Sequence, residues 1–175
     1  RPPGQVPLHL GNRIESGVVG RACGTHVTEE DKILTRRAID SVKVARQLDD
    51  PFEPMTFDVY WNVVSANNTY EGGWIPDSQI EAQMKVLNDD YNATGVSWRF
   101  VNTTRIMSAD RFQNVAHTER EPIMKRLFRK GNARALNIFT IGFNSTTKTL
   151  GYTSLPKDYA SNPWDDGIVP RPRPR

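Results

Sequence analysis

The stretch FDVYWNVV, residues 57–64, is the clearest strand signal in this sequence. Its apolar side chains stand at every second position, at Phe57, Val59, Trp61 and Val63. Because successive side chains of a strand point to opposite faces of a sheet, this spacing predicts a strand with one face in a core. Before this stretch the apolar spacing is that of a helix, so the architecture of the chain changes here.

A helix is predicted upstream of this strand, over residues 28–48. Thr28 and Asp31 stand three residues apart, as in a capping box at a helix start. The segment DDPFEP around Pro51 ends the helix, because residues before a proline avoid the helical conformation. Residues 1–20 are rich in proline and glycine and predict an irregular arm. The apolar positions of the helix are Ile33, Leu34, Ala38, Ile39, Val42, Ala45 and Leu48.

Helices and strands alternate after the first strand. The expected elements are a helix over 78–91 that Asp77 or Ser78 caps and Asn92 and Gly95 end, a strand over 96–100, a helix over 118–130, a strand over 135–143 and a short strand over 150–154. The strand over 135–143 has apolar side chains at both parities, which is typical of a central strand covered on two sides. This alternation predicts an α/β fold, a layered sheet whose parallel neighbours are joined by helical crossovers.

The charge of the chain does not indicate nucleic-acid binding. The 175 residues carry a formal net charge of +3, but Arg171, Arg173 and Arg175 in the Pro-Arg tail, residues 170–175, account for the whole excess. A neutral body lacks the basic stripe that phosphate binding requires. No apolar run approaches the ~20 residues that a membrane span needs. Neither nucleic acid nor a membrane is therefore an expected partner.

Four N-x-[ST] sequons indicate a secreted, extracellular protein. These glycosylation acceptors are Asn67, Asn92, Asn102 and Asn144, more than chance supplies in a chain of this length. The chain begins with arginine and has no basic-then-apolar leader, so we expect that a signal peptide has been removed. The single cysteine, Cys23, cannot form an internal disulfide and neither supports nor excludes export.

No catalytic motif is visible in the residues alone. The histidines, His9, His26 and His117, stand far apart. None of them belongs to an H-E-x-x-H motif. Cys23 and His26 form C-x-x-H, which is half of a zinc site without a second pair. No G-x-S-x-G elbow supports nucleophilic catalysis.

Two charged groupings and the thiol have plain structural interpretations. His117 with Glu121 four residues later is typical of a solvated helix start. Asp165 with Asp166 is typical of a turn. Cys23 alone could be a small core residue or an incidental thiol. On the residues alone, the chain is an exported α/β domain without an assembled catalytic site.

Five blocks of the sequence together resemble the pappalysin family of metzincin zinc metalloproteases, above all the small enzymes secreted by fungi. The blocks are RACGT (21–25), FDVYWNVV (57–64), IPDSQIEAQMKVLNDDYNATGVSWRF (75–100), LNIFTIGF (136–143) and LGYTSLPKDYASNPWDDGIV (150–169). The resemblance implies an α/β (mixed α+β) fold, the metzincin-like upper subdomain, with a twisted mixed sheet and one backing helix. It also implies the hydrolysis of peptide bonds in protein or peptide substrates.

The resemblance gives the cysteine a role. In this family an R-x-C-G segment of the prosegment places its thiolate on the catalytic zinc and keeps the enzyme latent. A thiolate is a good zinc ligand and would occupy the position of the attacking water. By resemblance, Cys23 is the latency switch, residues 1–51 are a helical prosegment, and residues 52–169 are the N-terminal part of the catalytic domain. The strand that pairs with an extended peptide substrate is matched by Leu150, Gly151, Tyr152 and Thr153.

The chain departs from the family at the motif that holds the metal. Soon after a DDG and a strand, such enzymes carry H-E-x-x-H-x-x-G-x-x-H, whose histidines hold zinc and whose glutamate activates water. The 175 residues contain no such motif, so zinc is expected in the full-length family and not in this chain alone. We expect a truncated N-terminal part of a secreted zymogen, inactive as it stands. Apolar sheet surface should be exposed where the zinc-binding helix packs beside the backing helix in the family.

A second hypothesis treats the chain as a complete product. It would then be a non-catalytic, secreted pseudoprotease that binds peptides at its edge strand, or that inhibits a metalloprotease partner in trans through Cys23. Loss of inhibition in a Cys23→Ser variant would separate this hypothesis from the first.

Overall fold

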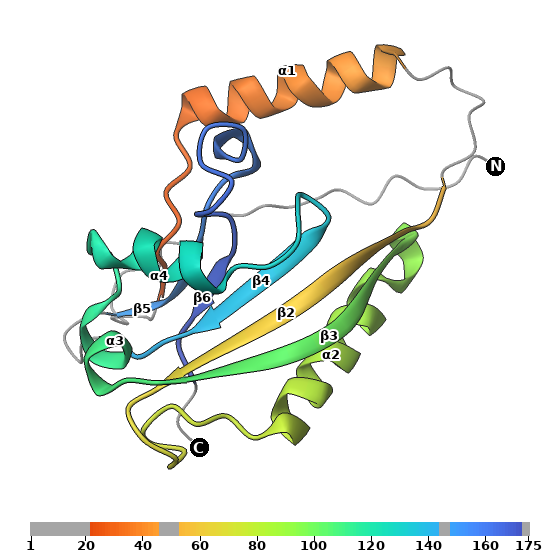
Figure 1. Ribbon diagram of the computed structural model, residues 1–175. Coiled ribbons are helices and arrows are strands. Elements are labelled where there is room, and N and C mark those ends of the chain that lie inside the picture. The colour runs from red at the N-terminus through yellow and green to blue at the C-terminus, as the bar shows by residue number, and fades with distance from the viewer. Residues whose placement is uncertain (1–21, 46–52, 144–147, 173–175) are drawn as a thin grey trace, which may run out of the picture.

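A twisted six-stranded sheet with helices on both faces forms the body of the protein (Figure 1). The computed structural model describes residues 22–45, 53–143 and 148–172. The strands are β1 (Ala22–Cys23), β2 (Met55–Ser65), β3 (Val96–Met107), β4 (Ala135–Thr140), β5 (Thr149–Thr153) and β6 (Ile168–Pro170). The helices are α1 (Glu29–Ala45), α2 (Asp77–Tyr91), α3 (Ala109–Asn114) and α4 (Arg120–Phe128), with short 3-10 turns at Asn92–Thr94 and Pro156–Asp158.

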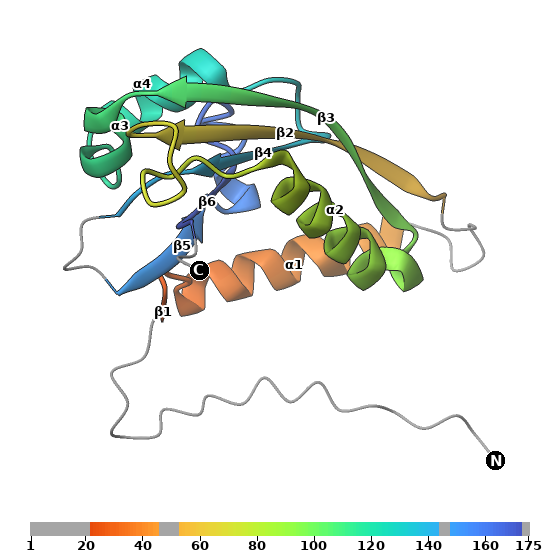
Figure 2. The ribbon, with the colours of Figure 1, turned by 90° about the horizontal axis from the view of Figure 1, so that it is seen from below.

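The sheet is mixed, and its order is β1-β5-β6-β4-β2-β3. β2 runs parallel to both of its neighbours, β3 and β4, and β6 runs parallel to β4. Only the β5–β6 pair is antiparallel. Figure 2 shows α2 on one face of the sheet and α3 and α4 on the other. The predicted α/β architecture with a mixed sheet is therefore confirmed.

The alternating stretch over 57–64 lies inside β2, as predicted. Val59, Trp61 and Val63 are buried on the α2 face, where they pack with Ile80 and Met84 of that helix. The opposite face has its own core, formed by Val64, Ile106, Val115, Met124, Phe139, Ile141 and Val169. β4 is central and largely buried, as its apolar residues predicted, but it ends at Thr140 and not at residue 143.

The start of α2 differs from the prediction. The residue before the helix is Pro76, which makes no side-chain cap, and Asp77 is already helical. The Asp77 carboxylate accepts a hydrogen bond from Arg105 on β3 (2.5 Å). The end of the helix agrees with the prediction: Asn92 is the C-terminal cap, and Gly95 adopts φ 74°. A glycine tolerates this left-handed conformation without steric cost.

Three strand features are absent from the predictions. β3 extends to Met107, beyond the predicted end at Phe100. The sequence pattern stops early because an extra residue near Val101 breaks the alternation of apolar side chains. β6 continues to Pro170 and thus includes the first residue of the segment that was expected to be a Pro-Arg tail. The two-residue β1 has no periodicity that a sequence pattern could reveal.

The helix predicted over 28–48 is present as α1. Its capping box is confirmed, because the Thr28 amide donates to Asp31 Oδ2 (2.9 Å) and the Asp31 amide donates to Thr28 Oγ1 (3.1 Å). Lys157 forms an ion pair with Asp31 at 2.9 Å and ties the helix start to the body. The rest of α1 stands apart from the sheet (Figure 1). The arm over 1–20 and the linker around Pro51 lie outside the described residues.

Most apolar side chains of α1 are exposed. They are Ile33, Leu34, Ile39 and Val42. Their exposure means that the helical periodicity does not reflect packing onto the described body. Across residues 22–45, 53–143 and 148–172, no helix is both long enough and apolar enough to traverse a bilayer.

Candidate functional site

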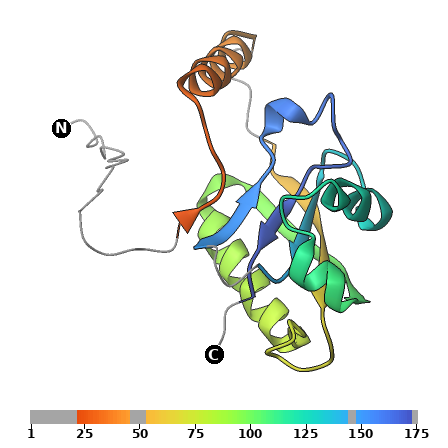
Figure 3. The same ribbon diagram turned by 90° about the vertical axis from the view of Figure 1, so that its left-hand side faces the viewer.

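The segment that contains Cys23 lies along the outer edge of β5. Ala22 is paired with Thr149 and Cys23 with Gly151, and the two strands run parallel (Figure 3). The Ala22 amide donates to the carbonyl of Lys148 (3.1 Å), and the Gly24 amide donates to that of Gly151 (2.8 Å). The structure thus brings together the predicted latency residue and the predicted substrate strand.

Close approach at this edge requires a glycine at position 24. A Cβ atom on Gly24 would lie 2.8 Å from Thr149 Cγ2 and 3.4 Å from Tyr152 Cβ. Beyond it, the Thr25 hydroxyl accepts a hydrogen bond from the Thr153 amide (3.0 Å). Residues 22–25 therefore follow β5 to its end.

The Cys23 thiol is exposed and free of disulfides. The Thr25 amide donates to its sulfur at 3.5 Å, and this hydrogen bond lowers the pKa of the thiol. A lowered pKa raises the thiolate fraction at neutral pH, and the thiolate is the form that binds metals. Cys23 is therefore chemically suited to donate one ligand to a metal ion presented from outside the described residues.

The described residues do not fit a complete metal site. Among residues 22–45, 53–143 and 148–172, no group of three or more His, Cys, Asp or Glu side chains could hold a metal ion. Cys23 with His26 supplies at most two ligands, and a closed zinc site takes four. Any zinc that Cys23 contacts must therefore be held mainly by other side chains.

β5 is bounded by backbone on both sides. Gly151 is paired with Cys23 on one side and with Pro170 of β6 on the other. A Cβ on Gly151 would lie 2.8 Å from the carbonyl oxygen of Val169, so only glycine fits between the two neighbours. The predicted substrate residues Leu150, Gly151, Tyr152 and Thr153 all lie in this strand.

An apolar groove of about 570 Å³ opens on the α2 face of the sheet. It lies between α2 and the strands β4, β5 and β6. Its floor includes Trp61, which is only 6% exposed and whose indole N–H has no hydrogen-bond partner in the described part of the chain. The remaining lining residues are Ile75, Gln79, Gln83, Leu87, Leu136, Ile138, Thr140, Leu150, Ile168, Pro170, Arg171 and Pro172. The sheet is therefore open where the resemblance places a second helix.

A buried ionic network supports β5 from the opposite face. Lys125 of α4 is 2% exposed and contacts Glu121 Oε1 at 3.0 Å and Asp165 Oδ1 at 2.9 Å. The Tyr152 hydroxyl donates to Glu121 Oε2, which also accepts from the His117 amide (2.9 Å). The His117 and Tyr152 rings stack with centroids 4.1 Å apart. The network fixes the side chain of the central β5 tyrosine.

The interpretation of Glu121 as part of a solvated helix start was wrong, whereas the turn expected at Asp165 and Asp166 is present. Glu121 is 5% exposed, so it is a core residue and not part of a solvated helix start. Asp165 and Asp166 do lie in a loop, but each pairs with a cation of α4: Asp165 with Lys125 and Asp166 with Arg129 (3.0 Å). The i,i+4 spacing of Glu121 and Lys125 is typical of an ion pair on a helix, and it was the sequence pattern that could have predicted this contact.

Burial raises the pKa of the Tyr152 hydroxyl well above its usual range. The hydrogen bond to the Glu121 carboxylate acts in the same direction, because a second negative charge beside that carboxylate is unfavourable. Tyr152 is therefore a neutral hydrogen-bond donor at every physiological pH.

The described sequons lie in three different settings. Asn67 stands in the exposed loop between β2 and α2, and Asn92 is exposed at the end of α2. Asn102 lies within β3 opposite Tyr60 and is half-buried. Asn144 lies outside the described residues.

The chain is similar to fungal extracellular metalloproteases. It is 31% identical to one from Uncinocarpus reesii over 137 residues, which cover 78% of this chain and 48% of that protein. It is 28% identical to one from Colletotrichum graminicola over 155 residues, which cover 85% of this chain and 53% of that protein. The chain spans about half the length of these curated relatives. No protein-family model matches it.

Solved structures of mirolysin share the fold. Promirolysin of Tannerella forsythia aligns with a TM-score of 0.57 and 20% identity, over 86% of this chain and 59% of that one. Mature mirolysin of the same organism, in complex with a cleaved peptide, aligns with a TM-score of 0.50 and 21% identity, over 69% and 54% of the two chains. The six-stranded mixed sheet with its helices is thus the mirolysin fold, and the sequence relatives are metalloproteases named as extracellular.

Proposed function

We propose that this chain is the N-terminal part of a secreted zinc metalloendopeptidase precursor of the pappalysin type, within the metzincins. Residues 1–51 act as the prosegment, and residues 52–169 form part of the catalytic domain, ahead of the Pro-Arg segment over 170–175, whose first residue lies in β6. The observation that carries the proposal is the pairing of the Cys23 segment with β5 through the Gly24–Gly151 hydrogen bond. It supports a latent state in which the chain covers its own substrate edge.

Occupation of the edge would contribute to latency alongside the thiolate of Cys23. An extended peptide that binds beside β5 needs the backbone groups of Leu150–Thr153 for its hydrogen bonds. In this structure the carbonyl of Gly151 and the amide of Thr153 are already bonded to Gly24 and Thr25. A protein or peptide substrate therefore competes with residues 22–25 for the same groups.

Zinc would be held mainly by side chains outside the described residues, which provide no such site themselves. When bound, the metal would supply the activation of water that peptide hydrolysis requires. Cys23 would contribute a thiolate ligand in the latent state. By itself the chain has no expected proteolytic activity.

The apolar groove supports the same proposal. It lies beside α2, where the resemblance places the zinc-binding helix, and it contains a buried indole N–H that has no partner among the described residues. An amphipathic helix packed there would cover the exposed apolar floor and complete the core on this face.

The proposal is tested first on the gene. The transcript and its genomic locus are sequenced past the codon for Val169 in all reading frames, and an H-E-x-x-H-x-x-G-x-x-H motif is expected there. If no frame contains it, the proposal of a protease precursor fails. If it is present, the complete protein is expected to be secreted in a latent form. Its Cys23→Ser variant should then show zinc-dependent cleavage of a casein substrate before prosegment removal.

A further inference from the structure

The described sequons differ in whether the folded chain can accept a glycan. An N-linked glycan is large and hydrophilic, so its asparagine must face solvent in the folded protein. We propose that Asn67 and Asn92 carry N-linked glycans and that Asn102 does not. This assignment rests on the proposed function in one respect, namely export of the protein.

Asn67 lies in a loop that is built around its amide oxygen. Oδ1 accepts hydrogen bonds from the Thr69 amide (2.9 Å) and from the Thr69 hydroxyl (2.7 Å). A Cβ on Gly72 would lie 2.0 Å from this oxygen, so the loop closes over it only with glycine at that position. Both hydrogen bonds engage Oδ1 and not Nδ2, the atom that a glycan would occupy, although Nδ2 would also lie 3.0 Å from that Cβ. Asn67, Asn68 and Thr69 are all exposed.

Asn92 lies where α2 ends. Its backbone amide donates to the carbonyl of Asp89, and its side chain is exposed. The sequon hydroxyl of Thr94 donates to the carbonyl of Tyr91 (2.7 Å) and accepts from the Val96 amide (3.2 Å). The local turn is therefore held by Thr94, and a substituent on Asn92 would disturb none of these bonds.

Asn102 lies in a setting that opposes a glycan. Its Oδ1 is buried without a hydrogen-bond partner in the described part of the chain. The residue is paired across the sheet with Tyr60, and the sequon hydroxyl of Thr104 lies 3.5 Å from Lys130 Nζ. Because Asn102 is half-buried within the β2–β3 ladder, a chain modified there should not complete this pairing.

The modification is a group transfer from a lipid diphosphate-linked oligosaccharide. Asn Nδ2 forms a bond to the anomeric carbon of the sugar, and the bond between that carbon and the diphosphate oxygen breaks. The lipid diphosphate leaves with the bonding electron pair, and Nδ2 loses one proton. Asn92 caps the C-terminal end of α2, and Asn67 lies in the loop that precedes this helix.

The test uses the full chain, secreted from a eukaryotic host behind a supplied leader. Glycans are removed with peptide-N-glycosidase in heavy-oxygen water, and mass spectrometry reads the conversion of each asparagine to labelled aspartate. Asn67 and Asn92 are expected to be labelled in most secreted molecules, and Asn102 in almost none. Asn67→Gln and Asn92→Gln should each remove one step of apparent mass, whereas Asn102→Gln should remove none.

Variants of Thr69, and a comparison of secreted with retained protein, separate the possible outcomes. Thr69→Ala should abolish labelling at Asn67, whereas Thr69→Ser should retain it. Labelling of Asn102 only in protein retained inside the cell supports the proposal. Labelling of Asn102 in the secreted protein overturns it, and so does a lack of label at Asn67 or Asn92. Because the leader is supplied, these results stand even if the native protein is not exported or proves not to be a protease precursor.

Discussion

The backbone amide of Thr153 donates a 3.0 Å hydrogen bond to the hydroxyl of Thr25, a residue 128 positions earlier in the chain. Replacing this hydroxyl by a methyl group of similar shape, in Thr25→Val, should loosen the end of the β1–β5 contact. A single hydrogen bond contributes about 0.5–1.5 kcal/mol net, so amide exchange at Thr153 should become roughly two- to tenfold faster. Hydrogen exchange measured by NMR checks this.

The control for that variant is Thr56→Val. The Thr56 hydroxyl bonds with the exposed Ser97 hydroxyl (2.8 Å), on strands that do not neighbour β5. It should leave exchange at Thr153 unchanged. Equal exchange rates in Thr25→Val and the parent chain would show that residues 22–25 do not protect the edge.

The tie between α1 and the body should be sensitive to acid. The hydrogen bond from Lys157 lowers the pKa of Asp31 from 3.8 to about 2, and the Thr28 capping bonds act in the same direction. Because the pKa in the folded state is below that in the unfolded state, the stabilisation is present above pH 3.8. It is lost as the pH falls through about 2. Asp158, the other charge that faces Lys157, is 3.5 Å away and belongs to the same loop.

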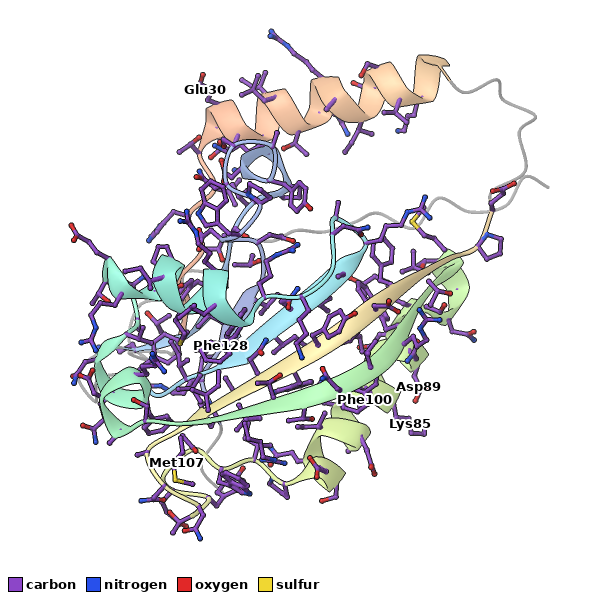
Figure 4. All side chains as sticks on the ribbon, viewed as in Figure 1. Glu30, Lys85, Asp89, Phe100, Met107 and Phe128 are labelled. Atoms are coloured by element: carbon purple, nitrogen blue, oxygen red, sulfur yellow. The ribbon has the colours of Figure 1, made fainter. Side chains whose placement is uncertain are left out.

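Asp31→Asn should abolish this acid transition. The variant loses the ion pair at all pH values, so proteolysis near the start of α1 should become faster at neutral pH and nearly independent of pH. Glu30→Gln is the control, since Glu30 is exposed and points into solvent from the same turn (Figure 4). A neutral-pH cleavage rate in Asp31→Asn equal to that of Glu30→Gln would contradict the prediction.

Loss of the buried lysine should be strongly destabilising. Lys125→Met leaves the Glu121 carboxylate buried without its cation, which costs about 3–5 kcal/mol. The double variant Lys125→Met/Glu121→Gln removes both charges and should recover part of that loss. Urea denaturation gives the free energies of unfolding.

An exposed ion pair provides the comparison. Lys85 and Asp89 lie on the solvent side of α2 (Figure 4), with a contact of 2.5 Å and side chains that are 76% and 61% exposed. Lys85→Met should cost no more than about 0.5 kcal/mol, because water screens such pairs. Similar costs for Lys85→Met and Lys125→Met would refute the assigned burial.

Tyr152 should make the fold sensitive to alkali. Its pKa is raised in the folded state, so its contribution to stability is complete below the ordinary tyrosine pKa of about 10. That contribution declines as the pH rises further, because the unfolded chain can then ionise the hydroxyl while the folded chain cannot. Tyr152→Phe should be less stable at neutral pH and should show a flatter alkaline decline. A parallel decline in both proteins would exclude Tyr152 as its source.

The elements with strong local periodicity could be predicted from the sequence. β2 was visible from alternation, α2 from its apolar face and its end at Gly95, and α1 from its capping box. The resemblance also predicted Cys23 as the latency residue and Leu150–Thr153 as the strand that binds an extended substrate. Their contact is now observed, while the roles themselves remain proposals.

The remaining features depend on contacts distant in sequence. β1 is a strand only because β5 lies beside it, and no two-residue segment has a period. Glu121 is buried because Tyr152 and Lys125 take both of its oxygens, although its neighbours in sequence are largely polar. The predicted strand over 96–100 is shorter than β3 because the extra residue near Val101 shifts the following side chains to the other face of the sheet.

The position of β1 in the sheet has a kinetic consequence. Its partner β5 is so distant in sequence that the pair can close only after the central strands have formed, since closing a long loop costs entropy before any contact compensates for it. β1 is thus the last strand to join and the first to leave. Its release breaks a few edge hydrogen bonds and leaves β2, β3 and β4 paired, so the edge of β5 can be exposed by a local opening that is far less costly than global unfolding.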